Sequence, residues 1–134
     1  MKIEHIGIAT NGIEEALGFW RDALGLTVVT TEEVEDQGVR VAMLPVGETR
    51  VELLEATDAG SPFAKSTAKR GVGVHHIAVR VDNILETLGR LKEHGARLID
   101  ESPRVGADNC LIAFIHPAST GGVLVELIEK VEFP

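Results

Sequence analysis

The sequence predicts an α+β fold made of two β-α-β-β-β modules related by pseudo-twofold symmetry. Three observations predict this fold: an internal repeat, a histidine-bearing strand at the start of each copy, and a helix that ends at a glycine. An offset of 76 − 5 = 71 residues aligns the following pairs: His5 with His76, Ile6 with Ile77, Ile8 with Val79, Asn11 with Asp82, Ile13 with Ile84, Glu15 with Glu86 and Leu17 with Leu88. We therefore expect a single domain over residues 1–134, with module one in about residues 1–55 and module two in about residues 72–130.

The first module begins with the alternating segment "IEHIGIA" at residues 3–9. Alternate side chains of a strand share a face, so His5 is predicted to lie with Gly7 and Ala9. Ile6 and Ile8 then lie on the opposite face, which we expect to pack under the following helix.

The helix of the first module is expected to begin after Asn11, which is a favourable N-cap residue, and to end at Gly25. Its apolar residues recur at helical spacing: Ile13, Leu17, Trp20 and Leu24. Three strands are then expected, over about residues 27–34, 39–45 and 50–55.

The second module repeats this order. Its first strand contains "VHHIAV", its helix is expected to begin after Asp82 and to end at Gly95, and strands are expected over about residues 97–101, 111–116 and 123–128. Between the modules, residues 56–71 are rich in small and polar side chains and are predicted to form a linker, with a short helix over residues 62–69.

Composition excludes several classes of function. The chain has 21 acidic and 13 basic residues, a formal net charge of −8, and no run of lysines or arginines, which disfavours binding to nucleic acid or to anionic membranes. No apolar stretch approaches the roughly 20 residues that cross a bilayer. Cys110 is the single cysteine, so no intrachain disulfide can form, and a cytoplasmic location is expected.

Each module carries one histidine and one glutamate in matching places. Glu52 in "VELLE" follows His5 by 52 − 5 = 47 residues, and Glu126 in "VLVELIE" follows His76 by 126 − 76 = 50 residues. Two such faces, related by pseudo-twofold symmetry, would aim two imidazoles and two carboxylates at one point. These ligands suit one divalent ion, such as cobalt, manganese, nickel, iron or zinc, with positions left open for substrate.

A structural role is the alternative for each of these residues taken singly. One histidine in a strand is more often hydrogen-bonded than metal-bound, and one glutamate in a strand is usually solvated. Their repetition in both modules favours the metal site. No such repetition supports His75, His94 or His116, for which structural or capping roles are expected.

With these residues identified, the sequence resembles the vicinal oxygen chelate (glyoxalase/bleomycin resistance/dioxygenase) superfamily and, within it, the methylmalonyl-CoA epimerase family. The resemblance spans almost the whole chain and is carried by these motifs: "HIGIA" at His5, "FWRDALGL" at Phe19, "VELLE" at Val51, "GVHHIAVRVDNI" at Gly73 and "HPASTGGVLVEL" at His116. It implies a half-open barrel around a metal ion that is held by His5, Glu52, His76 and Glu126.

The resemblance also implies an activity, which is metal-dependent interconversion of the two epimers of methylmalonyl-CoA. The proton alpha to the thioester would be transferred through a metal-stabilised enolate, and Glu126 would be the catalytic base. The implied partners are an acyl-CoA substrate and a second copy of the chain, as a homodimer.

The chain departs from the family pattern at three places. Val41 occupies the position where some members carry a glutamate as second base, so the base for the opposite face is open between Glu52 and a bound water. Ala118 replaces a common lysine, and the loop from Gly106 to Cys110 lacks the usual glycine and basic residue. Contacts to the acyl carboxylate or to coenzyme A are therefore expected to differ.

Two other functions are compatible with the same fold. A glyoxalase-I-type lyase would use the same four ligands on a glutathione hemithioacetal, whereas a non-enzymatic protein that binds a small ligand would not need them. A ring-cleaving dioxygenase is disfavoured, because its iron site uses two histidines and one carboxylate, and here a second carboxylate is present.

Overall fold

The computed structural model describes residues 1–106 and 109–131. The chain divides into two compact units, which comprise residues 5–75 in one unit and residues 1–4 with 76–134 in the other. The fold class is α+β, as predicted, and each unit contains strands and helices in the order β-α-β-β-β. None of the helices in the described part of the chain is long and apolar enough to span a membrane.

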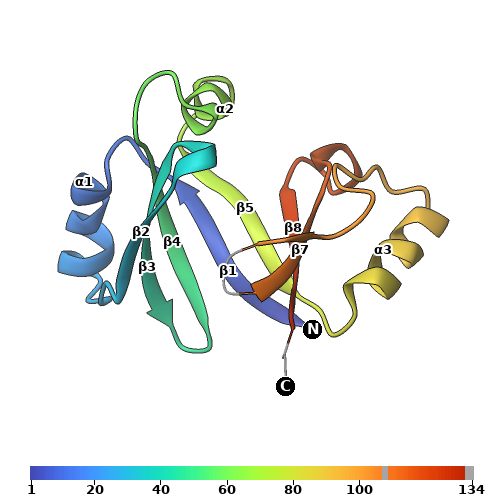
Figure 1. The fold of residues 1–134 in the computed structure, drawn as a ribbon. Coiled ribbons are helices and arrows are strands. Elements are labelled where there is room, and N and C mark those ends of the chain that lie inside the picture. The colour runs from blue at the N-terminus through green and yellow to red at the C-terminus, as the bar shows by residue number, and fades with distance from the viewer. Residues whose placement is uncertain (107–108, 132–134) are drawn as a thin grey trace. The chain divides into compact units, whose positions relative to one another are not determined.

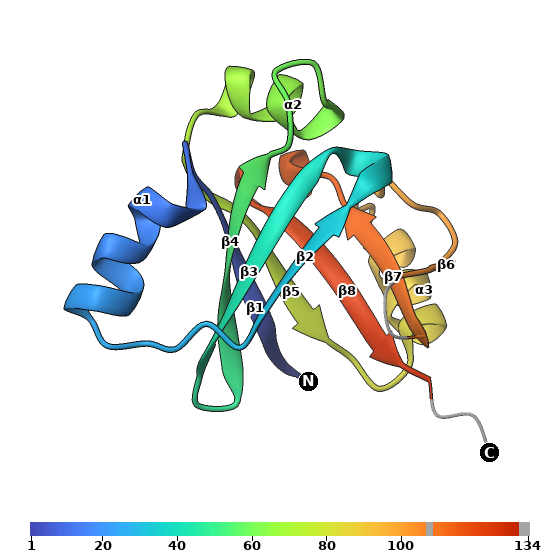
Figure 2. The same cartoon turned by 60° about the vertical axis from the view of Figure 1, so that its left-hand side comes forward.

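The unit of residues 5–75 contains a four-stranded sheet in the order β2-β3-β4-β1, shown in Figures 1 and 2. Its elements are β1 (Lys2–Ala9), α1 (Ile13–Leu17), a π-helical segment (Gly18–Ala23), β2 (Thr30–Val34), β3 (Val39–Val46), β4 (Thr49–Ala56) and α2 (Pro62–Arg70). The first strand pairs in parallel with the last, β1 with β4, and the remaining pairs are antiparallel.

The other unit repeats this arrangement with the strand order β5-β8-β7-β6. Its elements are β5 (Gly73–Arg80), α3 (Ile84–Glu93), β6 (Arg104–Val105), β7 (Cys110–Ile115) and β8 (Leu124–Lys130). Again the first and last strands are parallel, β5 with β8, and the sheet continues by antiparallel pairing to β7 and β6.

The helix of each unit covers one face of its own sheet, and the other face carries a separate apolar cluster. In residues 5–75, the cluster under α1 is Ile13, Leu17, Ala42, Leu44, Val51 and Leu53, with Ile8 packed against it. The opposite face holds Ala9, Val39, Val41, Leu54 and Phe63. The separation of Ile8 from Ala9 confirms the predicted alternation of the first strand.

The second unit has the same two-sided core. Under α3 lie Val81, Ile84, Leu88, Ala113, Ile115 and Leu127. The other face carries Ala78, Cys110 and Ile128. In both units the helix therefore occupies one side of the sheet, which leaves the histidine-bearing side for a site.

The predicted strand over residues 97–101 is wrong. The segment makes an isolated bridge between Leu98 and Ile115, and the strand that pairs with β7 on the side away from β8 is the two-residue β6. Side chains supplement a few backbone hydrogen bonds here: Asp100 accepts from the Phe114 backbone N–H at 2.8 Å, and Ser119 Oγ accepts from the Arg97 N–H at 2.7 Å. These bonds satisfy the backbone without regular pairing.

The predicted helix starts are each one residue early. The helices begin after Gly12 and Asn83, rather than after Asn11 and Asp82. Asn83 caps α3, because its side-chain oxygen accepts from the Glu86 N–H at 3.0 Å. The predicted helix of residues 62–69 is confirmed, and Ser61 caps it by accepting from the Ala64 N–H at 3.0 Å.

Candidate functional site

The first histidine–glutamate pair lies within the unit of residues 5–75. The parallel register of β1 and β4 sets Gly7 opposite Glu52, so His5 and Glu52 lie on the same side of neighbouring strands. His5 Nδ1 is 3.3 Å from Glu52 Oε2, and the two residues are 5% and 7% exposed. A buried carboxylate of this kind requires a cation or hydrogen-bond donors.

The carboxylate of this pair also contacts an arginine that was not identified from the sequence. Arg50 lies two residues before Glu52 on β4, and its Nε donates to Glu52 Oε2 at 2.7 Å. The Arg50 side chain is 32% exposed, so it joins the buried carboxylate to the surface. The signal in the sequence was the spacing of two, which puts both residues on one face of the strand.

The second histidine–glutamate pair lies within the other unit. Ala78 is opposite Glu126 in the parallel register of β5 and β8, which matches Gly7 and Glu52 in the first pair. His76 Nε2 is 3.5 Å from Glu126 Oε1, and the residues are 8% and 9% exposed. The donor atoms of this pair are close enough to bind a common ion.

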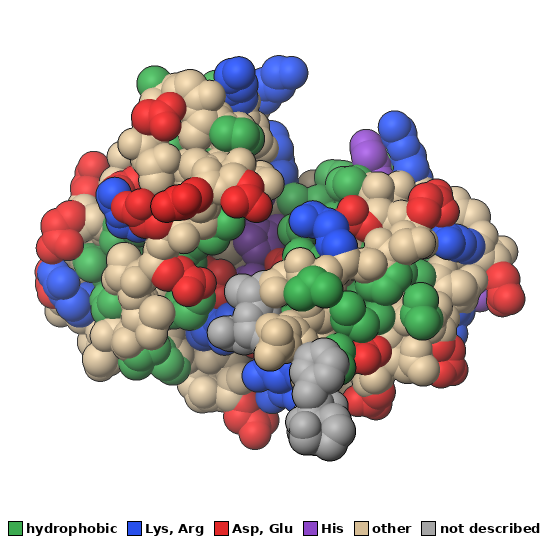
Figure 3. Space-filling view, viewed as in Figure 1, with side chains coloured by type: hydrophobic (Ala, Val, Ile, Leu, Met, Phe, Trp, Pro, Cys, Tyr) green, Lys and Arg blue, Asp and Glu red, His purple; other side chains and the backbone are tan. Residues whose placement is uncertain are grey.

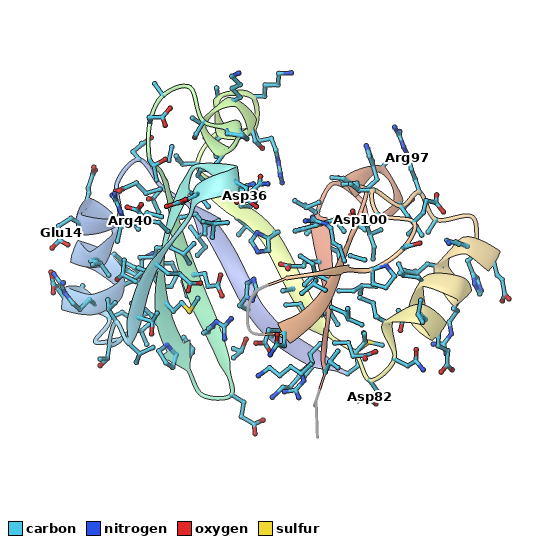
Figure 4. The ribbon with its side chains drawn as sticks, in the orientation of Figure 1. Glu14, Asp36, Arg40, Asp82, Arg97 and Asp100 are labelled. Carbon is cyan, nitrogen blue, oxygen red and sulfur yellow. The ribbon has the colours of Figure 1, made fainter. Side chains whose placement is uncertain are left out.

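An aromatic ring lies beside the second pair, and a basic side chain lies over that ring. The Phe114 ring stands edge-on to His76 with 6.4 Å between ring centroids, and Phe114 is the β7 partner of Glu126. The Arg104 guanidinium lies 5.6 Å from the centroid of the Phe114 ring and 3.3 Å from Asp100, which is labelled in Figure 4. The Arg104 cation is thus held by both the Phe114 ring and the Asp100 carboxylate.

Val41 lies on the same face of its unit as the first pair. It is 5% exposed and packs with Ala9, Leu54 and Phe63. The valine side chain can fill space and exclude water, but it cannot transfer a proton.

The other histidines have local roles. The His75 ring lies 5.3 Å from Phe63, and burial, with the nearby Arg70 guanidinium, lowers the pKa of His75 to about 4. The His94 ring contacts the Arg90 carbonyl at 2.9 Å, and His116 Nδ1 accepts from the Ala118 N–H at 3.0 Å. These contacts fit the expected structural and capping roles.

The repeated glutamates Glu55 and Glu129 accept hydrogen bonds from the first residues of the helices. Glu55 Oε1 accepts from the Ile13 N–H at 2.8 Å, and Glu129 Oε1 accepts from the Ile84 N–H at 2.8 Å. The last strand of each unit therefore caps the first turn of its helix. The sequence signal was present in the repeat, where "ELLE" matches "ELIE".

The loop from Gly106 to Cys110 is described in part, because Ala107 and Asp108 lie outside the described residues.

On the face seen in Figure 3, acidic and basic side chains are interspersed, without a continuous basic area. Arg40, labelled in Figure 4, illustrates this surface: it pairs with Glu33 at 2.8 Å and with Glu55 at 2.5 Å.

Comparison with known proteins identifies the family of the chain. A family model described as the Glyoxalase/Bleomycin resistance protein/Dioxygenase superfamily matches residues 4–114. An uncharacterised protein of Bacillus subtilis (strain 168) is 43% identical over 128 residues, which cover 96% of this chain and 91% of that protein. An ethylmalonyl-CoA/methylmalonyl-CoA epimerase of Cereibacter sphaeroides is 37% identical over 128 residues, which cover 94% of this chain and 96% of that enzyme.

A solved structure of a related enzyme has the same fold over the full length of the chain. Methylmalonyl-CoA epimerase from Streptomyces coelicolor, as a variant in complex with 2-nitronate-propionyl-CoA, matches with a TM-score of 0.85 and 37% identity. The match covers 100% of this chain and 99% of that chain. The similarity therefore includes both units and the strands that carry the two histidine–glutamate pairs.

Proposed function

Since the chain belongs to the glyoxalase/bleomycin resistance/dioxygenase superfamily and, within it, to the methylmalonyl-CoA epimerase family of isomerases, we propose that it interconverts the two epimers of methylmalonyl-CoA. The observation that carries this proposal is the repeated buried pair: His5 with Glu52 in one unit, and His76 with Glu126 in the other. A binding protein without chemistry has no need of two buried carboxylates, each beside an imidazole.

The donor set fits a divalent ion. Two imidazoles and two carboxylates, each at most 9% exposed, are the borderline nitrogen and oxygen ligands that cobalt, manganese, nickel, iron and zinc accept. We propose that His5, Glu52, His76 and Glu126 together hold one such ion. When bound, the ion would stabilise the negative charge that develops on the thioester oxygen by several kcal/mol.

Proton transfer is assigned to Glu126. Its carboxylate lies beside His76 and next to Phe114 on β7, in a setting with little access for water. It would remove the proton from the alpha carbon, which lies between the thioester and the carboxylate of the substrate, and leave an enolate. Return of a proton to the opposite face of that carbon then gives the other epimer.

The group on the opposite face is not Val41, which has no proton to transfer. Glu52 and a bound water are the candidates for that step. The Arg104 guanidinium lies over the ring of Phe114, which is the β7 partner of Glu126, and we propose it as the cation for the substrate's own carboxylate. This would compensate for Ala118, which cannot supply the charge of a lysine.

The proposal also covers the setting of the enzyme. We propose that both modules act as one domain, that the chain forms a homodimer, and that it works in the cytoplasm on acyl-CoA substrates. Sedimentation of the purified protein at micromolar concentration tests the dimer. A sedimentation coefficient of a single chain over that range would contradict it.

The decisive experiment is solvent deuterium incorporation at the alpha carbon of methylmalonyl-CoA. Metal-loaded protein in deuterated buffer should exchange this proton, and removal of the ion with a chelator should stop the exchange. Failure to exchange with each of the five metals would exclude the epimerase. Turnover of a glutathione hemithioacetal in its place would identify the lyase.

A further inference from the structure

We propose that Arg50 is a positioning residue of the metal site, which holds the Glu52 carboxylate in the orientation that a bound ion requires. This inference rests on the proposed function, because it takes Glu52 as a ligand. It adds a residue outside the two histidine–glutamate pairs, and it concerns the unit of residues 5–75 alone.

The contacts of Glu52 define the orientation. Arg50 Nε donates to Oε2 at 2.7 Å, and the same oxygen is 3.3 Å from His5 Nδ1. Both contacts are made to one oxygen, so they fix the rotation of the carboxylate and the direction of its second oxygen. A charge-assisted hydrogen bond of this length is short and directional.

Burial makes this contact matter. Glu52 is 7% exposed, so water cannot readily replace the guanidinium as its donor. The Arg50 side chain, at 32% exposed, keeps contact with solvent while its Nε reaches the buried carboxylate. Loss of the arginine would remove the donor that holds the Glu52 carboxylate in this orientation.

The repeat shows that the strand itself does not require an arginine here. Glu52 and Glu126 occupy matching places, opposite Gly7 and Ala78 respectively. Two residues before Glu126 the chain has Leu124, where the first module has Arg50. The same parallel strand pair thus forms with an apolar residue at this place, so the guanidinium serves the carboxylate rather than the sheet.

Metal affinity of the metal-stripped protein tests the inference without any turnover. Titration calorimetry with Mn²⁺ and Co²⁺ would compare the parent with Arg50→Leu, which copies the second module. Residues that orient ligands contribute about 10- to 100-fold in affinity, so we expect a loss of that size for Arg50→Leu and a smaller loss for Arg50→Lys. The visible spectrum of bound Co²⁺ should change in Arg50→Leu, because one oxygen ligand is displaced.

A double-mutant cycle separates positioning from a general effect of charge or stability. In a Glu52→Gln background, which removes the charge that Arg50 holds, Arg50→Leu should change affinity by no more than about twofold. Arg40→Leu is the matched control, since Arg40 pairs with two carboxylates of the same unit. It should leave metal affinity within about twofold of the parent value.

Three outcomes would overturn the inference. They are parent affinity in Arg50→Leu, an equal loss in the parent and Glu52→Gln backgrounds, and a parent protein that binds neither ion. Circular dichroism of each variant identifies a loss of fold. If Arg50→Leu does not fold, the metal affinity of Arg50→Lys is compared with that of the parent, and an equal affinity would overturn the inference. Metal binding with the expected cycle but without alpha-proton exchange would refute the proposed epimerase and leave the role of Arg50 intact.

Discussion

At the scale of single residues, the two histidines and two glutamates are distinguished by their burial beside one another. An imidazole in a strand is unremarkable alone, but His5 and His76 each lie within 3.5 Å of a carboxylate that is itself buried. Burying such a pair is costly unless the charges are compensated. A divalent ion is the compensation that we propose, and two substitutions test it.

The first substitution is His76→Ala. It removes one proposed ligand, so the expected result is a loss of metal and, through that loss, of activity. Excess Mn²⁺ or Co²⁺ should then restore part of the rate, because three ligands remain. Metal content by mass spectrometry, measured with the rate of alpha-proton exchange, checks this. A variant with full metal occupancy and full rate would show that His76 is not a ligand.

The second substitution is Glu126→Gln. The amide oxygen can still coordinate, but the amide cannot accept the alpha proton, so metal should be largely retained. The rate should fall by about 10²- to 10⁴-fold, the usual contribution of general acid–base catalysis. Exchange measured separately from each epimer should be affected unequally if Glu126 serves one face. Epimerisation at the parent rate by the metal-loaded variant would show that Glu126 is not the base.

At the scale of the elements, the last strand of each unit is tied to the start of its helix. Glu55 and Glu129 accept from the first helical N–H groups of α1 and α3, across 42 and 45 residues of sequence. An isolated α1 of five residues would not be stable. The capping carboxylates and the apolar cluster beneath it therefore stabilise this helix.

This capping predicts the effect of Glu129→Ala. The Ile84 N–H loses its acceptor and the helix end loses a favourable negative charge, so the free energy of unfolding should fall by about 1 kcal/mol. Urea denaturation measures the change. Glu101→Ala is the control, because Glu101 is an exposed glutamate outside the helix and pairs with Lys92 at 3.4 Å. A stability loss no larger than that of the control would show that the cap is unimportant.

The elements also show how far local sequence pattern reaches. Alternation and the repeat predicted the order of strands and helices and the faces of β1. They failed at residues 97–101, where Asp100 and Ser119 bond the backbone from outside the ladder. They also placed the caps one residue early, on Asn11 and Asp82. At α3 the neighbouring Asn83 is the cap, and at α1 the first N–H donates to Glu55, which lies 42 residues away in the sequence.

The candidate site was predictable to a similar extent. The four residues of the two pairs could be identified from the internal repeat, since each half of the chain contains a similar histidine-bearing strand and the same "VEL" segment. Arg50 was not identified, because the spacing of two places it on the same strand face as Glu52 but does not show that the two side chains bond. The second module has no arginine in that place to repeat.

At the scale of the whole molecule, both units use one plan in which the first and last strands are parallel neighbours. The paired residues are far apart in sequence: 51 − 6 = 45 residues for Ile6 and Val51, and 125 − 77 = 48 for Ile77 and Val125. Contacts of this separation slow folding, so we expect refolding from urea in milliseconds to seconds rather than microseconds. Stopped-flow fluorescence of Trp20 would measure it, and a microsecond phase carrying the full amplitude would contradict the expectation.

The parallel pairing also has a consequence for the newly made chain. On a ribosome that adds about 5 to 20 residues each second, β5 would be synthesised about 2 to 10 s before the strand that completes its hydrogen bonds. During this interval the edge of β5 that later pairs with β8 has no partner, and an open edge of an apolar strand is a site for association with other chains. Protection of β5 by a chaperone is therefore most valuable before residue 124 has left the ribosome, and a chain stalled earlier than this would be prone to aggregate.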